Sequence, residues 1–600
     1  MFAERLDRTP MESLLTGAPA LTCPEAGDPA WGNIRPEHRA EIAALAEEYG
    51  KKPYPARTAS GFLEFVRSGS RRADEDPYFF RRRKLCAAAL ACCAGETDRL
   101  DEALDGIWCV CEETSWVISA HNVNPIPGAP APAEYPLPDP EKPYVDLFAA
   151  QTGMILSLVR RMLGKRLDAV SPVVGARIGR EIDRRILIPF MENDDFWWMG
   201  FRRKDLNNWT PWIVSNVMVC AFLRDAGKEK TAALLDRACR MLDRWLDTVP
   251  ADGGCDEGAG YWNMAGGALL DCLEMLENAT EGRLTFRGDE KIRNIMRFPL
   301  EAEIGNGYFL NFADCDARPF LSGERLQTAG ETLGDPALTA LGNRMRGTVT
   351  DQLKDTPHLT RALSLLFHAP AKGAEEGKRE DAWLPDLQVR VVRRGGLTLG
   401  CKGGHNGENH NHNDVGSFVL YADGEPEIVD AGNMTYTAKT FSAERYTLWN
   451  TRSAYHSVPV IGGREQAAGT ERRARGTEAL PDGLRLDMAE AYGPGAGVVS
   501  CTRETTLDGE GLTVRDRIET EKPEEVRWTF LFRNRPERTE TGLETERIRL
   551  EIPEGMSTET EEIPVTDPRM ARNWPGSLWR ARITAGAARL HTAEWRFEKK

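Results

Sequence analysis

The sequence has 600 residues, of which 41% are apolar and 28% charged, so it is too long for one ordinary core and too apolar to be disordered. Its 77 basic and 92 acidic residues give a formal net charge of −15. This charge excludes a protein whose whole surface binds nucleic acid or an anionic membrane. A polyanionic partner would have to meet a local basic patch.

The thirteen cysteines are an odd number and lie mostly in apolar runs typical of helices, which predicts buried, reduced thiols. Residues 1–27 carry two early acids and a short apolar stretch broken by proline, unlike a signal peptide. No run approaches the roughly 20 apolar residues that span a bilayer. We therefore expect a cytoplasmic protein that binds neither nucleic acid nor a membrane.

Residues from 35 to 370 have the pattern of consecutive helices. Apolar residues recur at intervals of three and four, as in 147–163 and 230–249. A proline-rich stretch, 124–143, interrupts the pattern and is predicted as a loop. The pattern indicates a helical domain over residues 1–375, and its paired helices are compatible with a toroid.

Near residue 385 the pattern changes to short β-rich runs separated by Gly and Asp-Gly turns. These runs predict an antiparallel β domain over residues 376–600. The stretch 369–378 is the predicted connection between the two domains.

Three of the nine histidines fall within residues 405–412. A predicted hairpin follows, with strands 417–421 and 426–430, and its return brings Asp430 back beside His412. His456 opens the next predicted strand, where it can be presented to the same corner. Two imidazoles and one carboxylate suit zinc or another first-row divalent ion. We favour a metal site over the alternative, a turn in which these side chains only bond the backbone.

A predicted helix, 212–223, has Thr210 as its N-cap and Pro211 as its first residue. Asn208 and Trp209 then lie at a helix N-terminus, where unpaired N–H groups and the helix dipole favour an anion. This place suits an amide that binds a carboxylate and an aromatic platform for a sugar. Taken alone, local capping by Asn208 and core packing by Trp209 explain the pattern better.

A glycine-rich turn, 252–260, leads into another predicted helix, which ends near Leu276. Tyr261 is expected in the first turn of this helix, and Gly258 and Gly260 leave room for a ligand to approach. A structural role for this tyrosine is the alternative. Trp116 and His121, beside a predicted helix end, are weaker candidates for a cleft wall.

Five motifs follow one another in the order NNW (207–209), DEGAGYW (256–262), HNHND (410–414), IVDAG (428–432) and AYHSVPVIGG (454–463). With these motifs the chain resembles the heparinase II/III-like polysaccharide lyases over most of its length. The resemblance implies an N-terminal (α/α) incomplete toroid followed by a C-terminal antiparallel β-sandwich. It also implies an acidic oligosaccharide or polysaccharide as the substrate.

The resemblance implies a role for individual residues. Tyr261 is the expected catalytic acid/base, His410 assists it, and Asn208 neutralises the substrate carboxylate. The residues that match the family's metal ligands are His412, Asp430 and His456, which imply one divalent ion, zinc or manganese, in a structural role. The residues expected to contact the substrate are Trp209, His405, Glu257, Arg452, Arg203, Trp116 and His121.

The sequence departs from the family pattern in two places. Trp209 stands where many relatives have histidine. One group that would neutralise the substrate carboxylate is therefore missing, and we expect His405 or Arg452 to supply it. Ser457 follows His456 where many relatives have asparagine, and we expect no effect on metal binding. The side chains expected to form a local basic patch are Arg202, Arg203, Lys204, Arg445 and Arg452.

The expected reaction is β-elimination at a uronic acid. It requires removal of a weakly acidic proton beside the carboxylate, neutralisation of that carboxylate, and return of a proton to the leaving oxygen. A tyrosine, with an ordinary pKa of about 10, is useful as a base only where cations or hydrogen bonds lower its pKa. We expect cleavage of glycosaminoglycan-type or alginate-type glycans, preferably oligosaccharides, to a 4,5-unsaturated uronate.

Two other classes of function stay open. A toroid glycoside hydrolase would use paired carboxylates, Asp256 with Glu257 or Glu112 with Glu113. A glycan-binding protein would need no catalytic residue. Only a lyase makes a product with a conjugated double bond, which absorbs ultraviolet light. The sequence leaves open whether the protein forms a homodimer.

Overall fold

The computed structural model describes residues 1–95, 97–122, 136–373 and 379–600. The chain divides into two compact units. The helical unit comprises Met1–Val249, Asn263–Asp289 and Leu321–Glu376, and the β unit comprises Pro250–Trp262, Glu290–Phe320 and Gly377–Lys600. The predicted proline-rich loop at 124–143 and the connection at 369–378 lie partly outside the described residues.

Two segments within the predicted helical domain belong to the β unit instead, 250–262 and 290–320. The second segment contains a short hairpin, β1 (Glu303–Gly305) and β2 (Tyr308–Phe309). After this hairpin, the side-chain amide of Asn311 donates to the backbone carbonyl of Asp430 at 2.9 Å. Hydrogen bonds of this kind hold the segment in the β unit. They cannot be predicted from the helical periodicity of the sequence.

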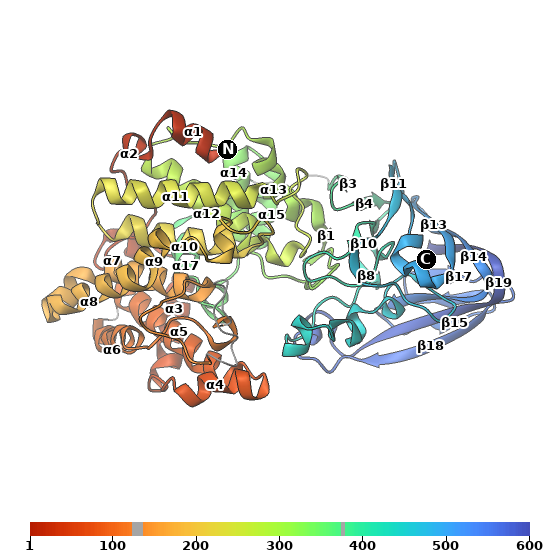
Figure 1. The fold of residues 1–600 in the computed structure, drawn as a ribbon, viewed down its shortest axis with the longest axis horizontal. Helices are drawn as coiled ribbons and strands as arrows, with labels where there is room; N and C mark the ends of the chain where they lie inside the picture. Colours follow the sequence, from red (N-terminus) through yellow and green to blue (C-terminus); the bar gives the residue numbers. More distant parts are fainter. Residues whose placement is uncertain (96, 123–135, 374–378) are drawn as a thin grey trace. The chain divides into compact units, whose positions relative to one another are not determined.

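The helical unit is drawn in red to green in Figure 1. Its α-helices are α1 (Phe2–Arg8), α2 (Met11–Leu14), α3 (Pro36–Gly50), α4 (Ala59–Ser68), α5 (Arg72–Ala94), α6 (Leu100–Cys111), α7 (Leu147–Val170), α8 (Pro172–Ile182), α9 (Ile188–Glu192), α10 (Trp209–Leu223), α11 (Lys228–Leu246), α12 (Gly266–Ala279), α14 (Gly323–Leu333), α15 (Pro336–Arg344), α16 (Val349–Leu353) and α17 (Leu359–Phe367). The prediction of consecutive helices is confirmed.

Apolar patterning separates inner from outer helices. α10 is apolar on every side and buried from Thr210 to Ala221, whereas α11 buries one face, including Leu235 and Leu242, and exposes the other. The inner helices α7, α10, α12, α14 and α17 contact one another in succession, and α17 contacts α7 again. This ring, with an outer partner beside several of its members, confirms the predicted toroid.

The start of α10 differs from the prediction. The helix begins at Trp209 and Asn208 occupies the N-cap position. Thr210, the predicted cap, lies inside the first turn, where its hydroxyl donates to the backbone carbonyl of Trp198 at 2.5 Å. This tertiary hydrogen bond overrides the local capping signal.

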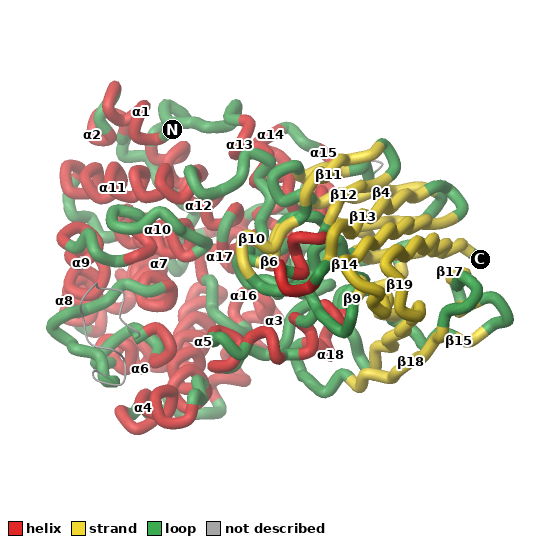
Figure 2. The backbone as a smooth tube through the Cα atoms, turned by 45° about the vertical axis from the view of Figure 1, so that its right-hand side comes forward, coloured by secondary structure: helices red, strands yellow, loops and turns green. Residues whose placement is uncertain are grey.

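The β unit contains one extended antiparallel sheet, which Figure 2 shows in yellow. Its strands are β3 (Ala382–Leu384), β4 (Val389–Arg394), β5 (Leu397–Lys402), β7 (Phe418–Ala422), β8 (Glu425–Ile428), β9 (Pro459–Ile461), β11 (Arg475–Leu480), β12 (Gly483–Asp487), β13 (Val498–Leu507), β14 (Gly511–Phe532), β15 (Glu537–Arg538), β16 (Gly542–Glu544), β17 (Ile548–Glu551), β18 (Ser557–Pro564) and β19 (Ser577–Lys599). A small second sheet pairs β6 (His405–Asn406) with β10 (Gly469–Arg473), and two helices, α13 (Glu290–Ala302) and α18 (Met570–Asn573), complete the unit.

The long strands β14 and β19 pair from Gly511 with Glu598 to Phe532 with Trp579. Their register shifts between Glu519 and Val526, and such bulges bend a strand pair. Alternate side chains of both strands point into one core. The aromatic members of this core include Trp528, Phe530, Trp595, Phe597 and Phe418. The predicted antiparallel β-sandwich is confirmed.

The predicted hairpin is present as β7 and β8, joined by Asp423 and Gly424. Both turn residues have positive φ, 53° and 79°, as a two-residue hairpin turn requires. All thirteen cysteines lie in the described residues and are free thiols. Among the helices that the structure describes, none has both the length and the apolarity to cross a bilayer.

Candidate active site

Tyr261 lies in a 3-10 turn, Ala259–Met264, that precedes α12, and not in the helix itself as predicted. Gly258, at the start of this turn, has φ of +85°, and a Cβ there would lie 2.6 Å from the Cβ of Cys315. Only glycine fits such a position. The turn presents the Tyr261 hydroxyl to the hydroxyl of Tyr436, 2.6 Å away.

His410 completes this group. Its ring centroid lies 5.0 Å from that of Tyr261, and its Nδ1 lies 3.1 Å from the Tyr436 hydroxyl. The same Nδ1 lies 3.0 Å from Oδ2 of Asp314. Because a carboxylate can only accept, the hydrogen of His410 is on Nδ1 and is shared between Asp314 and Tyr436. The Tyr436 hydroxyl then has its own hydrogen to donate to Tyr261.

The electrostatics of the tyrosine pair differ from the expectation. Burial raises the pKa of Tyr261 well above its ordinary value, and the neighbouring Tyr436 and Glu257 raise it further. Burial also raises the pKa of Tyr436. A lowered pKa, the condition under which Tyr261 would act as a base, is therefore not met, because the cost of burying a phenolate exceeds the effect of the local cation. Tyr261 is a protonated phenol at neutral pH.

The cation beside this pair is Arg569, which the sequence analysis missed. Its guanidinium lies 5.2 Å from the ring centroid of Tyr436 and 3.4 Å from Asp316. No motif marks it, since it lies 308 positions after Tyr261 in a short turn of the β unit. Of the two cations proposed from sequence, Arg452 is paired with Glu465.

His405, the other proposed partner of the substrate carboxylate, lies in β6 and its Nδ1 accepts from the backbone N–H of Gly407 at 3.2 Å. Burial lowers the pKa of His405, with the charges of Lys402 and Arg473 acting in the same direction. The ring is therefore neutral near pH 7 and supplies no charge. Glu257 is buried, with 2% of its surface exposed.

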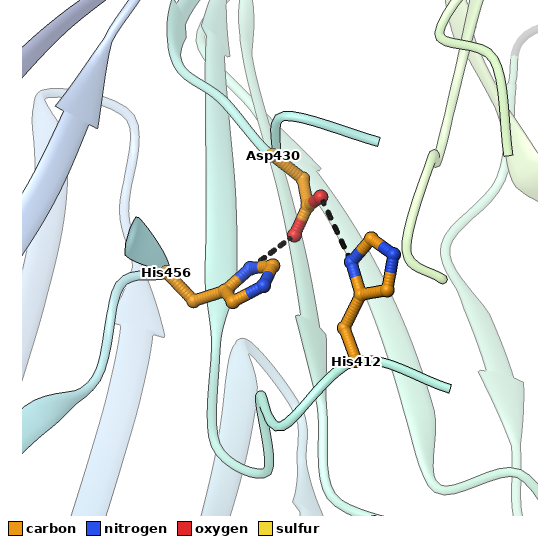
Figure 3. Close-up of side chains that lie close together, drawn as sticks. All are labelled: His412, Asp430 and His456. Atoms are coloured by element: carbon orange, nitrogen blue, oxygen red, sulfur yellow. Dashed lines mark hydrogen bonds and ion pairs between the residues drawn. The ribbon is translucent and has the colours of Figure 1, made fainter. Parts of the chain in front are cut away.

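The three predicted metal ligands lie together, as Figure 3 shows. Oδ2 of Asp430 is 2.8 Å from Nδ1 of His456, and Oδ1 is 4.0 Å from Nδ1 of His412. One ligand atom from each residue falls within 4.8 Å of the others, and all three side chains are buried. Burial raises the pKa of Asp430, but the neighbouring His456 outweighs it and the net pKa is below its ordinary value.

The residues fit a divalent ion. Nδ1 of His412 and Nε2 of His456 are buried without a hydrogen-bond partner among the described residues. Nε2 of His412 is meanwhile held by Oδ1 of Asp314 at 3.1 Å. A histidine that offers one nitrogen to a metal commonly donates the other N–H to a carboxylate. The three side chains form a candidate metal site.

The helical unit carries the remaining candidates at the N-terminus of α10. The ring of Trp209 lies 4.8 Å from that of His121 and 5.1 Å from that of Trp197. The guanidinium of Arg203 lies 5.4 Å from the Trp197 ring. Beside Asn208 there is therefore an aromatic cluster with a cation at its edge. All of these residues except Trp197 are among those predicted from the sequence to contact the substrate.

Two expectations about the helical unit and the basic side chains are wrong. Trp116 is only 2% exposed and its indole N–H donates to the backbone carbonyl of Val110, so it packs the core and forms no wall. The expected basic patch is neutralised, since acids hold four of its five members in ion pairs. These pairs are Arg202 with Asp195, Arg203 with Asp205, Arg445 with Asp314, and Arg452 with Glu465.

Residues 376–593 match the family described as Heparinase II/III-like, C-terminal. This match covers the predicted β domain and confirms the resemblance predicted from the sequence motifs. No curated protein sequence matches the chain closely enough to show a relationship.

The fold of the whole chain is similar to solved structures of low sequence identity. A heparinase III is 12% identical, with a TM-score of 0.61 and coverage of 96% of this chain and 86% of that one. The heparan sulfate lyase HepC from Pedobacter heparinus is 12% identical, with a TM-score of 0.55 and coverage of 94% and 88%. A mutant chondroitin AC lyase from Streptomyces coelicolor is 14% identical, with a TM-score of 0.55 and coverage of 95% and 80%. These likenesses confirm the predicted architecture.

Proposed function

We propose that this protein cleaves uronic-acid-containing glycans by β-elimination and releases a 4,5-unsaturated uronate. The observation that carries the proposal is the hydrogen-bonded series Asp314, His410, Tyr436 and Tyr261. This series places a protonated phenol beside an imidazole of fixed orientation. The similar structures support the substrate class, since their names are those of lyases acting on acidic polysaccharides.

The reaction breaks the C–H bond beside the carboxylate and the bond from the adjacent carbon to the leaving oxygen, and it forms a double bond between the two carbons. Tyr261, protonated because its pKa is raised, donates its proton to the leaving oxygen. His410 has its hydrogen on Nδ1, so the lone pair of Nε2 accepts the proton from carbon. In this proposal Tyr261 is the general acid, as predicted, and His410 is the general base in place of Tyr261.

The proton balance is restored through Tyr436. After elimination His410 carries an extra proton and Tyr261 has lost one. His410 passes Nδ1–H to the Tyr436 hydroxyl, which lies 3.1 Å away, and Tyr436 passes its own hydrogen to Tyr261 over 2.6 Å. His410 is then left with its hydrogen on Nε2, and the starting tautomer returns when Nε2–H is lost to water and Nδ1 regains a hydrogen from water.

The substrate carboxylate needs a partner as negative charge spreads onto it. Asn208 suits this role because it occupies the N-cap position of the 15-residue helix α10, where the helix dipole favours an anion. In the β unit, the group that we assign to this role is Arg569, beside Tyr436. Its positive charge serves in place of the histidine that Trp209 displaces from the family pattern.

The site of His412, Asp430 and His456 is proposed to hold one divalent ion, zinc or manganese. The ion would be structural, because its ligands come from three separate loops and all are buried. When bound, it would supply positive charge that holds these loops together.

We also propose that the protein acts in the cytoplasm on short oligosaccharides. The net charge of −15 repels a long polyanion, and the basic side chains that would have attracted one are paired with acids. A short chain carries less charge into the site and meets less of this repulsion.

The hydrolase alternative is weaker. Glu113 is held by Arg81 and Arg82 at 3.1 and 2.8 Å, and these arginines outweigh burial and keep its pKa below the ordinary value. Such a carboxylate is not a general acid. Asp256 accepts two hydrogen bonds from Asn409, while Glu257 is buried.

The direct test is incubation with glycosaminoglycans and alginate, in polymer and oligosaccharide form, followed at the ultraviolet wavelength of the unsaturated product. An absorbing product from one of them supports the proposal. Water incorporation without absorbance identifies a hydrolase, and binding without any product identifies a glycan-binding protein.

A further inference from the structure

One buried carboxylate, that of Asp314, holds both histidines of the HNH sequence. Oδ2 lies 3.0 Å from Nδ1 of His410, and Oδ1 lies 3.1 Å from Nε2 of His412. The Asp314 residue is 2% exposed. Because each oxygen serves a different ring, a displacement of this one side chain moves both imidazoles.

The surroundings of Asp314 hold its side chain in a single orientation. Arg445 forms an ion pair with Oδ2 at 2.9 Å, and the side-chain amide of Asn433 donates to the Asp314 backbone carbonyl at 2.9 Å. The group therefore accepts from both rings.

The backbone on both sides of the contact is strained. Ala313 has φ of 62° and His410 has φ of 53°, in the left-handed region that residues other than glycine rarely adopt. Such conformations persist where the surrounding structure determines them, and they gather at functional sites. The contact between Asp314 and His410 is thus made at a conformational cost on each side.

The two hydrogen bonds set the two ring tautomers in opposite ways. His410 carries its hydrogen on Nδ1 and keeps a lone pair on Nε2. His412 carries its hydrogen on Nε2 and keeps a lone pair on Nδ1, the nitrogen that faces Asp430. One ring is thereby set for proton transfer and the other for a cation.

We propose that Asp314 is a positioning residue that couples the cation site to the catalytic histidine. The coupling rests on the proposed function, since it gives His410 its part in elimination. A cation on Nδ1 of His412 fixes that ring and its Nε2–H, which in turn fixes Asp314 and keeps His410 oriented. Loss of Asp314 therefore weakens cation binding and catalysis together, although it touches neither the cation nor the substrate.

The test compares four variants with the wild type. Each protein is stripped of metal and titrated with zinc chloride in a calorimeter, and it is then assayed on the uronate glycan that the wild type cleaves. Asp314→Asn offers one acceptor oxygen in place of two, so either His410 or His412 loses its hydrogen bond to residue 314. We expect its zinc affinity to fall roughly 10- to 100-fold, the usual effect of losing a carboxylate behind a metal-bound histidine. We expect kcat to fall at least about tenfold with KM nearly unchanged, because substrate contacts remain.

His410→Gln is the matched variant on the catalytic side. It removes the catalytic ring but leaves Asp314 and His412 in contact, so kcat should be lost while zinc affinity stays at the wild-type value. Asp487→Asn is the control for loss of a carboxylate in the β unit, since Asp487 accepts from the backbone N–H groups of Ala489 and Cys501 and touches neither histidine. It should change neither quantity.

Asp314→Glu keeps a carboxylate and covers the case in which the asparagine variant does not fold. If both variants fold, Asp314→Glu should bind zinc more tightly than Asp314→Asn. If only Asp314→Glu folds, it should bind zinc more weakly than the wild type and have a reduced kcat. The coupling is overturned if a folded Asp314 variant binds zinc with wild-type affinity. It is also overturned if the variant loses only zinc affinity or only kcat. If the wild type cleaves no uronate glycan, the proposed function fails, while the zinc affinities of the Asp314 and His410 variants still judge the role of Asp314.

Discussion

The hydroxyl groups of Tyr261 and Tyr436 lie 2.6 Å apart, although the two residues are 175 positions apart in the chain. Tyr436 adds to the effect of burial in raising the pKa of Tyr261, and it also connects Tyr261 to His410 through hydrogen bonds. This relationship gives the first two predictions.

Tyr261→Phe should abolish turnover and leave the fold unchanged, because it removes one hydroxyl and keeps the ring. The loss should exceed tenfold in kcat, above about 1.4 kcal/mol. Exchange of the substrate proton beside the carboxylate with deuterated solvent should continue, since His410 removes that proton. Tyr455→Phe, a half-buried tyrosine of the same unit, should keep wild-type rates. A Tyr261→Phe enzyme with more than a tenth of wild-type activity contradicts the assignment.

Tyr436→Phe should lower kcat by about tenfold with little change in KM, because it breaks the hydrogen-bonded path between His410 and Tyr261 but leaves both residues in place. The ring still packs beside Arg569. Steady-state kinetics on the wild-type substrate measure the effect. An unchanged kcat would show that the second tyrosine only fills space.

Protein purified without added metal should contain one divalent ion per chain, and His412→Ala should contain none. Removal of the ion by a chelator should lower the melting temperature, because the buried ligands His412, Asp430 and His456 then lose the charge that holds three loops. Elemental analysis and thermal unfolding measure the two effects. A metal-free wild type, or a His412→Ala variant of full stability, rules out a structural ion.

Glu408 should make folding stability depend on pH. Burial raises its pKa to about 6 from 4.5, even though the charge of Lys402 lowers it. The folded protein then binds this proton more tightly than the unfolded chain, so the contribution is fully present below pH 4.5 and is lost as the pH rises through about 6. Relative to Glu408→Gln, the free energy of unfolding of the wild type should increase by at most about 2 kcal/mol when the pH falls from neutral to 4.5.

Urea unfolding of both proteins at the two pH values measures this difference. Glu546→Gln is the control, because the Glu546 side chain is 81% exposed and should leave the pH dependence of the wild type unchanged. A pH dependence in Glu408→Gln equal to that of the wild type would mean that Glu408 keeps an ordinary pKa.

Short uronate oligosaccharides should be consumed faster than long chains. The paired basic side chains leave little to attract a polyanion to a protein of net charge −15. Product sizing over time on a long chain and on a tetrasaccharide compares the two. Rapid cutting in the middle of the polymer, at a rate above that of the tetrasaccharide, contradicts the expectation.

Local sequence patterns are enough to predict the helical and β regions, the hairpin of β7 and β8, and the residues of the candidate metal site. Helix and strand periodicity follow from local geometry, and the Asp423-Gly424 turn sets its own hairpin. His412 and Asp430 lie on either side of that hairpin, so their proximity follows from local structure alone. The ordered motifs then identified Tyr261 and His410.

The groups that support Tyr261 and His410 become evident only in the folded chain. Asp314 lies in a segment without helical or strand periodicity of its own, Tyr436 follows β8, and Arg569 lies near the C-terminus. Nothing in the local sequence distinguishes these residues from other acids, tyrosines and arginines, because their roles depend on contacts between distant segments. The raised pKa of Tyr261 belongs to the same class, since burial is a property of the packed protein and not of the sequence around the residue.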